Sequence, residues 1–203
     1  MKKLLYTLLA VSIIFSACKK EEDEPNNSGN NNNSALAIGD FDQGGVIFYL
    51  DGNGGGLVCD IQDLSLVPWG CEGILISGSD GTTIGTGNQN TIDILAGCTG
   101  STGQPFPGIA ALECVNSTAQ GYSDWFLPSK DELHEIYVNR DAINTTSLAN
   151  GGNAFGTSGL NSVYWSSTEN HLNSAFQQFF SGTGVSIGVL KSSPASVRAI
   201  RAF

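Results

Sequence analysis

Apolar residues in this chain come in short runs, separated by turns rich in glycine, serine and asparagine. Residues 44–50 form an apolar run opened by glycines, which is typical of a buried strand. A turn at 51–54 and a second apolar run at 57–59 follow, so the pattern predicts a hairpin. Residues 63–103 are polar and irregular, and a loop of this length needs ties to hold it.

Two helices are predicted in the middle of the chain. Residues 108–120 repeat apolar side chains at helical spacing. The second helix begins at Ser129, because Ser129 and Glu132 have the spacing of a capping box, which is worth about 1 kcal/mol. Arg140 suits the negative C-terminal end of this helix.

Strands return after the second helix, and they are predicted at residues 164–168, 175–180, 185–190 and 197–203. A turn at 181–184 joins the middle two. In the last strand Arg198 and Arg201 lie on opposite faces, so the alternation leaves open which face is buried. Strands are thus expected at both ends of the domain, with helices between them.

The first segment is a targeting signal. Lys2 and Lys3 precede an apolar stretch at 4–15, which is too short to span a bilayer of roughly 30 Å. Small residues before Cys18 resemble the lipobox of bacterial lipoproteins, so residues 1–17 are predicted to be a lipoprotein signal peptide and Cys18 the lipidated residue. The alternative is an ordinary signal peptide followed by a chance cysteine.

Residues 18–38 are predicted to be the lipidated Cys18 and a disordered tether, because they carry too little apolar surface to offset their ordering entropy. The acidic run at 21–24 resembles the surface-export signal of lipoproteins in the Bacteroidetes group. We therefore expect a lipid anchor in the outer membrane, with the domain at 39–203 facing the cell exterior. A plain spacer facing the periplasm is the alternative.

Four cysteines remain in the domain, and an exported location is oxidising. Cys59, Cys71, Cys98 and Cys114 are therefore expected to form two disulfides, for which three connectivities exist. Pairing of sequence neighbours, Cys59 with Cys71 and Cys98 with Cys114, is favoured, and each loop would be worth roughly 3 kcal/mol. A zinc site is not expected, because there is no CxxC and no histidine lies near a cysteine.

The charge balance excludes one class of partner. The chain has 9 basic and 19 acidic residues, for a net charge of -10, and loss of Lys2 and Lys3 with the signal makes it -12. Four residues of each sign precede residue 34, which leaves 5 basic against 15 acidic residues in the domain. Since no block of Lys or Arg occurs, we expect no nucleic-acid partner.

Three segments follow one another in a fixed order: residues 121–133 (GYSDWFLPSKDEL), 164–169 (YWSSTE) and 197–201 (VRAIR). Together they resemble the DUF1566 family, also described as the C-terminal domain of the Legionella collagen-like adhesin, over residues 39–203. The resemblance implies a C-type-lectin-like α+β fold, with a small, mainly antiparallel sheet, two helices, long irregular loops and paired N- and C-terminal strands. In such folds the long loop region often forms the ligand face, a role that residues 63–103 would fill.

Candidate ligand-binding residues lie mostly in that loop region. Trp69 either stacks on a sugar ring or packs over the loop between Cys59 and Cys71. The remaining polar candidates are Asp80, Asn88, Asn90 and Glu169. Trp125 and Trp165 lie in the signature segments among small and apolar residues and are expected in the core.

Calcium is the one cofactor that these residues suggest. Asp80, Asn88, Asn90 and Asp93 offer oxygen ligands, but their spacing does not match an EF-hand, and Asn-rich segments usually make turns. The segment at Glu169 also departs from the Trp-Asn-Asp strand of calcium-dependent lectins. We therefore expect no cofactor, with calcium as the alternative.

No catalytic motif occurs. The sequence contains no GxSxG, HExxH or P-loop, and neither His134 nor His171 has a nucleophile at a recognisable spacing. We expect a surface lipoprotein with a non-catalytic domain that binds a glycan or a host surface. Sulfated polyanions are disfavoured by the acidic domain, although the adhesin resemblance suggests them. The alternative is a structural cell-envelope component that binds a protein partner through an apolar patch.

Overall fold

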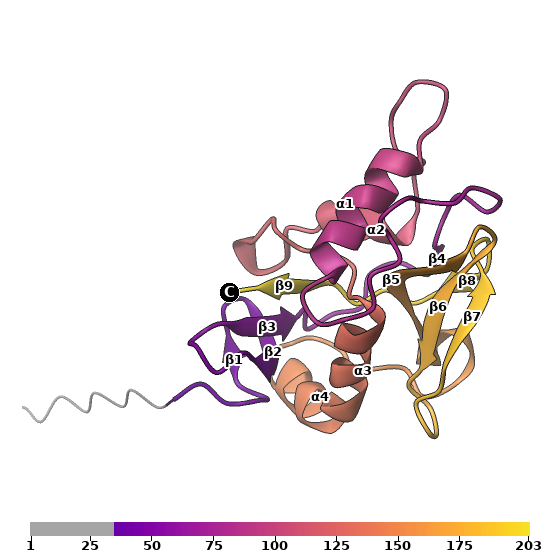
Figure 1. The fold of residues 1–203 in the computed structure, drawn as a ribbon. Coiled ribbons are helices and arrows are strands. Elements are labelled where there is room, and N and C mark those ends of the chain that lie inside the picture. Colours follow the sequence, from indigo (N-terminus) through magenta and orange to yellow (C-terminus); the bar gives the residue numbers. More distant parts are fainter. Residues whose placement is uncertain (1–34) are drawn as a thin grey trace, which may run out of the picture. The chain divides into compact units, whose positions relative to one another are not determined.

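Three small antiparallel sheets and four α-helices build residues 35–203, the part of the chain that the computed structural model describes (Figure 1). This confirms the predicted α+β class and its small antiparallel sheets. The C-type-lectin-like assignment stays a prediction. The predicted signal peptide, Cys18 and most of the predicted tether lie outside the described residues.

The predicted hairpin forms the centre of the first sheet. Its strands are β1 (Phe41–Asp42), β2 (Gly45–Leu50), β3 (Gly56–Cys59) and β9 (Ile200–Ala202), in the order β1-β2-β3-β9. The C-terminal strand joins this N-terminal sheet, but its neighbour is β3, with Val58 opposite Arg201. The expected pairing of N- and C-terminal strands is therefore confirmed, although the partner of β9 is the second strand of the hairpin and not the first. Because β1 and β3 occupy both edges of β2, β9 cannot pair with β2 and instead pairs with β3.

The second sheet contains the predicted strands of the C-terminal half. It consists of β5 (Val163–His171), β6 (Ser174–Phe179) and β7 (Ser186–Leu190), in sequence order. Two short strands, β4 (Val67–Pro68) and β8 (Pro194–Ala195), form a third sheet. The single strand expected at 197–203 is thus observed as the shorter strand β9, and a separate short strand, β8, precedes it.

Strand β5 is irregular at the YWSSTE segment. Trp165 pairs with Gln177 and Glu169 pairs with Ala175, so β5 holds two more residues than β6 between these pairs. Such a bulge releases backbone groups from the sheet and bends the strand. The released residues, 166–168, instead bond to segments from the middle of the chain, as described below.

Within residues 35–203, four α-helices are present where two were predicted. They are α1 (Gly87–Gly97), α2 (Ala110–Val115), α3 (Lys130–Val138) and α4 (Arg140–Ala149). The capping box of α3 is confirmed, since Ser129 and Glu132 each bond to the other's backbone. Arg140 begins α4, and its guanidinium donates to the carbonyl of Tyr137 at the end of α3 (2.8 Å).

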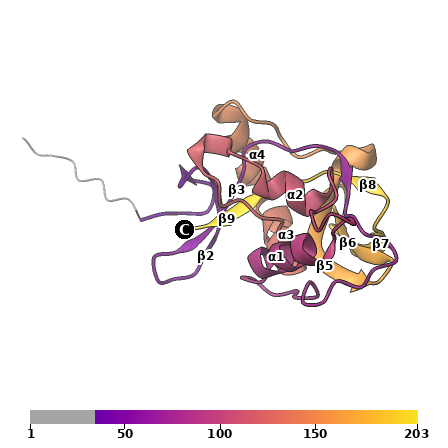
Figure 2. The same cartoon turned by 90° about the horizontal axis from the view of Figure 1, so that it is seen from above.

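Helices α1 and α4 were missed because their buried faces are narrow. In α1 the buried positions are Gly87, Asn90, Thr91 and Ile94, and in α4 they are Ile143 and Ser147. Neither face presents the broad apolar stripe by which amphipathic helices are recognised. Figure 2 shows α1 lying beside β5, so the segment expected to be irregular is partly a helix packed on the second sheet.

Two clusters of buried apolar side chains form the core. The first contains Trp69, Trp125 and Trp165, which confirms the predicted core position of the last two. The second includes Tyr164 and Phe180, whose rings pack 4.5 Å apart between centroids. None of the helices within residues 35–203 has the length and apolar composition needed to cross a membrane.

Both arginines of the VRAIR segment are buried, which answers the question that alternation left open. Arg198 donates its Nε–H to Asp63 (2.7 Å) and its other guanidinium N–H groups to backbone carbonyls. Arg201 makes two bonds to the carboxylate of Asp124 (2.8 and 3.0 Å). Because each guanidinium pairs with an aspartate, the side chains on both faces of the segment can be buried.

Candidate functional site

One disulfide closes the loop region. It joins Cys71 to Cys98, with the Cα atoms 5.5 Å apart, whereas Cys59 and Cys114 are buried free thiols. The expected pairing of sequence neighbours is therefore wrong. Cys59 lies in one core cluster and Cys114 in the other. Burial raises the pKa of the Cys59 thiol to about 12, so this thiol is unreactive in the fold.

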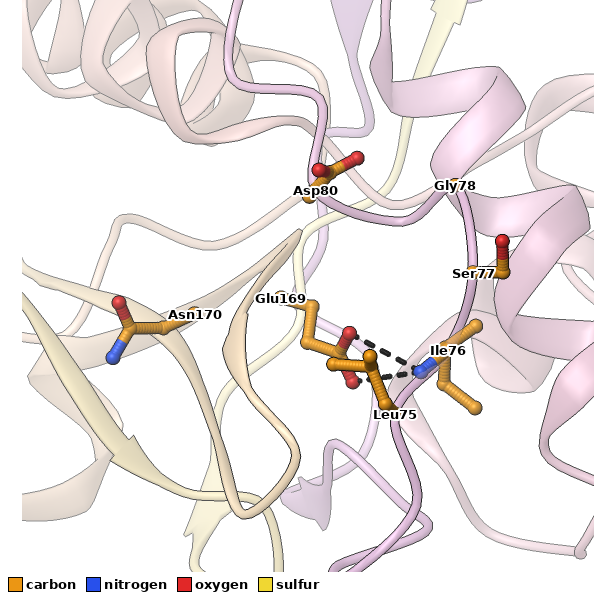
Figure 3. A pocket seen from close by; sticks show the side chains of 7 residues that line it. All are labelled: Leu75, Ile76, Ser77, Gly78, Asp80, Glu169 and Asn170. Carbon is orange, nitrogen blue, oxygen red and sulfur yellow. Dashed lines mark hydrogen bonds between the residues drawn. The ribbon is translucent and has the colours of Figure 1, made fainter.

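The loop that this disulfide closes forms one wall of an open hollow of about 350 Å³ (Figure 3). The opposite wall is the end of β5. The residues that line the hollow are Leu75, Ile76, Ser77, Gly78, Asp80, Glu169 and Asn170. We call this space the loop hollow.

Glu169 forms the buried floor of the loop hollow. Its side chain extends from β5 to the loop, and both carboxylate oxygens accept the backbone N–H of Ile76 (3.0 and 3.1 Å; Figure 3). The ammonium of Lys191, which is fully buried, bonds to the same carboxylate and to the carbonyl of Ile74 (2.7 Å). Lys191 therefore neutralises Glu169 and ties the loop to the second sheet.

The bulge of β5 holds the rest of the loop in place. The hydroxyl of Thr168 donates to the carbonyl of Gly81 (2.7 Å) and accepts the N–H of Lys130 at the start of α3 (3.0 Å). The N–H of Glu169 donates to the carbonyl of Ser79 (2.7 Å). The YWSSTE segment thus acts as a scaffold that positions the loop hollow.

The rim of the loop hollow keeps polar groups free. Within the described residues, neither the carboxylate of Asp80 nor the hydroxyl of Ser77 has a hydrogen-bond partner, and both residues are exposed. The amide nitrogen of Asn170 donates to Ser174 (3.0 Å), which leaves its oxygen as an acceptor. Leu75 adds an apolar side chain that is 68% exposed.

The structure brings together two of the five candidate ligand residues. Asp80 and Glu169 line the loop hollow, and Asn88 is exposed on α1 outside its lining. Asn90 is buried, and its amide donates to Gly81 and Ser167, so it is corrected from a ligand residue to a structural one.

Trp69 also requires correction. It is fully buried and its indole N–H donates to the carbonyl of Ser166 (2.9 Å), so it packs rather than stacks on a ligand. The Lys191 ammonium lies 4.6 Å from its ring centroid. The sequence did not indicate Leu75, Ser77 and Asn170 as lining residues. The only signal for Leu75 was an apolar residue in a polar loop, and the only signal for Asn170 was its position next to the candidate Glu169.

Metal ligands are not gathered at this site. Residues 35–203 contain no group of three or more His, Cys, Asp or Glu side chains that could hold a metal ion. Among the proposed calcium ligands, Asn90 is engaged inside the fold and Asp93 accepts the amide of Gln89 (3.0 Å). These contacts give the calcium prediction no support.

A second hollow, of about 280 Å³, lies between the start of α3 and strands β6 and β7. It is lined by Lys130, Asp131, His134, Gln178, Gly184 and Ser186. His134 contacts the Gln178 amide nitrogen (3.0 Å), which also donates to the carbonyl of Gly184, so the Nδ1 atom of His134 acts as the acceptor. None of the five candidate ligand residues lies here.

A family model described as the Lcl C-terminal domain matches residues 86–201, which is more than half of the chain. The matched segment runs from the start of α1 into β9 and contains all three signature segments. Glu169, at the floor of the loop hollow, lies inside the matched segment, whereas the loop residues 75–80 precede that segment. No curated protein matches the chain.

Proposed function

The chain belongs to the Lcl C-terminal domain family, an adhesin-type family, and we propose that its domain is a non-catalytic module that binds a glycan. The observation that carries this proposal is the loop hollow. Unpaired polar groups and an exposed leucine line it, and the buried carboxylate at its floor, Glu169, is already neutralised by Lys191. Sugar hydroxyls would bond to Asp80, Ser77 and Asn170. The C–H face of a sugar ring would pack on Leu75.

The state of Glu169 supports binding rather than acid-base chemistry. A general acid or base needs a carboxyl group that can exchange a proton with the substrate. Glu169 is 6% exposed and its oxygens are occupied by Ile76 and Lys191. Of the two carboxylates of the loop hollow, only Asp80 is free to contact a ligand, so the paired acid and base of a glycosidase are not provided there.

The proposed setting is the outer membrane, with Cys18 as the lipid anchor and the domain facing the cell exterior. The support comes from the sequence: an apolar segment before Cys18 and an acidic run directly after it. Treatment of intact cells with a protease that does not enter them should degrade a displayed domain. Survival of the domain until the cells are lysed would contradict surface display.

A glycan array, probed with the purified full-length protein in detergent, tests the binding function. We expect binding to a restricted set of glycans, and loss of that binding in Leu75→Ala. Leu148→Ala is the matched control, because Leu148 is 60% exposed on α4 and does not line the loop hollow. Absence of binding to any glycan, with and without calcium, would contradict the proposal.

An apolar sheet edge favours one second candidate function, a structural envelope component that binds a protein. Strand β7 is an edge strand, and Val185, Ile187 and Leu190 at or near it are each at least 42% exposed. A free edge with apolar side chains suits pairing with a strand of another protein. Co-purification of a stoichiometric partner, lost in Ile187→Lys, would favour this function over glycan binding.

A further inference from the structure

Each cation of the domain already has a partner other than Asp80. Lys191, Arg198 and Arg201 are buried against carboxylates. Arg140 bonds to the end of α3, and Lys130, which lines the second hollow, lies over the ring of Phe176. Within residues 35–203, these are all the basic side chains apart from the two histidines. Among residues 35–203, no basic side chain forms an ion pair with the carboxylate of Asp80.

The rim of the loop hollow is rich in acceptors. Asp80 and the side-chain oxygen of Asn170 accept hydrogen bonds, and the Ser77 hydroxyl can accept as well as donate. A protonated primary amine offers three N–H donors and a positive charge, which is the complement of such a rim. A carboxylate or a sulfate group would instead meet the unpaired charge of Asp80.

The size of the loop hollow and its other lining residues indicate which kind of molecule would carry that amine. Its volume of about 350 Å³ lies at the lower end of the range for small-ligand sites, which is enough for a sugar unit and too small for a protein element. Leu75 supplies an apolar contact for the C–H face of a ring. Hydroxyl groups next to the amine would bond to Ser77 and Asn170, and a lysine side chain lacks such groups.

The charge of the whole domain acts in the same direction. With 15 acidic and 5 basic residues after position 34, its field attracts cations and repels anions. A chain of amino sugars carries many positive charges, so the field would concentrate it near the surface before the loop hollow is filled. Steering of this kind weakens as salt is added, since the Debye length is about 8 Å at physiological ionic strength.

From these contacts we infer that the loop hollow binds an amino sugar with a free amine, and that the ammonium group sits against Asp80. This inference rests on the proposed glycan-binding function and deepens it by naming the sugar class. Acetylation of the amine removes both its charge and two of its donors, so an N-acetylated sugar is a poorer ligand. The second hollow, which contains Lys130, is not the amine site.

Calorimetric titration of the purified full-length protein tests this assignment with three probes: a glucosamine trimer, an N-acetylglucosamine trimer and a lysine-containing tripeptide. We expect the glucosamine trimer to bind at least roughly tenfold more tightly than either of the others. Asp80→Asn should remove most of this preference. Asp141→Asn is the matched control, because it makes the same change in charge at a 90% exposed side chain on α4.

Each other outcome overturns a distinct part of the inference. Equal binding of the two trimers would overturn the amine and leave glycan binding intact. Equal binding of the tripeptide would overturn the sugar as the carrier. A preference that survives Asp80→Asn would overturn the location. If neither trimer binds and the array is also blank, the proposed function fails together with the inference.

Discussion

Glu169 and Lys191 form the buried ion pair that joins the loop to the second sheet. We predict that Glu169→Gln lowers the free energy of unfolding by roughly 3–5 kcal/mol, because it leaves the Lys191 ammonium buried without a countercharge. Urea unfolding of the variant beside Asp141→Asn measures this. A loss below 1 kcal/mol would mean that the pair does not support the fold.

Asp124 gives the fold a measurable pH dependence. Its hydrogen bond to Arg201 holds the pKa of the carboxyl below the ordinary 3.8. The folded pKa is thus lower than the unfolded one, so the contribution of this bond is complete above pH 3.8 and is lost as the pH falls through the lower folded pKa. Asp124→Asn should flatten the fall in the free energy of unfolding below pH 4, measured by urea titration.

The cysteines give a chemical test of the fold. Without reductant, we predict that alkylating reagent leaves Cys59 and Cys114 unmodified in the native protein and labels both after denaturation, since both thiols are buried. Peptide mapping should find Cys71 linked to Cys98. A peptide linking Cys59 to Cys71 would contradict this arrangement. Reduction of the native disulfide should cost roughly 3–4 kcal/mol.

Individual ligand residues were only partly predictable. Asp80 and Glu169, two of the predicted ligand residues, line the loop hollow, and their role in binding stays a prediction. Asn90 and Trp69 were named wrongly, because each is buried by a partner far along the chain, Ser167 and Ser166 respectively. A single sequence gives no sign of contacts between segments that are so far apart.

At the level of elements, the bulge in β5 determines where the loop lies. Thr168→Val keeps the shape of the side chain but removes the bonds to Gly81 and Lys130. We predict a loss of roughly 1–3 kcal/mol in the free energy of unfolding, because the N–H of Lys130 loses its acceptor and the carbonyl of Gly81 keeps only the bond from Asn90. Ligand affinity should fall in the same variant. Unchanged stability would show that the YWSSTE segment is not the scaffold.

Helix prediction succeeded where local chemistry was strong. The helix α3 has a capping box and an apolar repeat, and both are present. By contrast, α1 and α4 consist largely of Asn, Thr, Ser and Gly, whose intrinsic preference for helix is weak. Packing against β5 and against α3 and β2 stabilises these two helices, and sequence patterns do not report such contacts.

At the level of the molecule, three short signature segments indicated the family, and the resemblance implied the α+β fold class, in agreement with the order of the apolar runs. The position of the ligand site did not follow. It depends on how a disulfide, a buried ion pair and a bulge bring residues 75–80 against the end of β5. The disulfide, the ion pair and the contacts of the bulge each join residues far apart in the sequence, so none of them could be predicted from the sequence alone.

Nuclear magnetic resonance titration tests the central claim, that the loop hollow is the ligand site. Amide signals of the isotopically labelled protein would be followed while the glucosamine trimer is added. The predicted result is that the largest shifts occur at Ser77, Gly78, Asp80 and Asn170, with little change at His134. Shifts centred on the second hollow, around His134 and Gln178, or no shifts at saturating trimer, would contradict the claim.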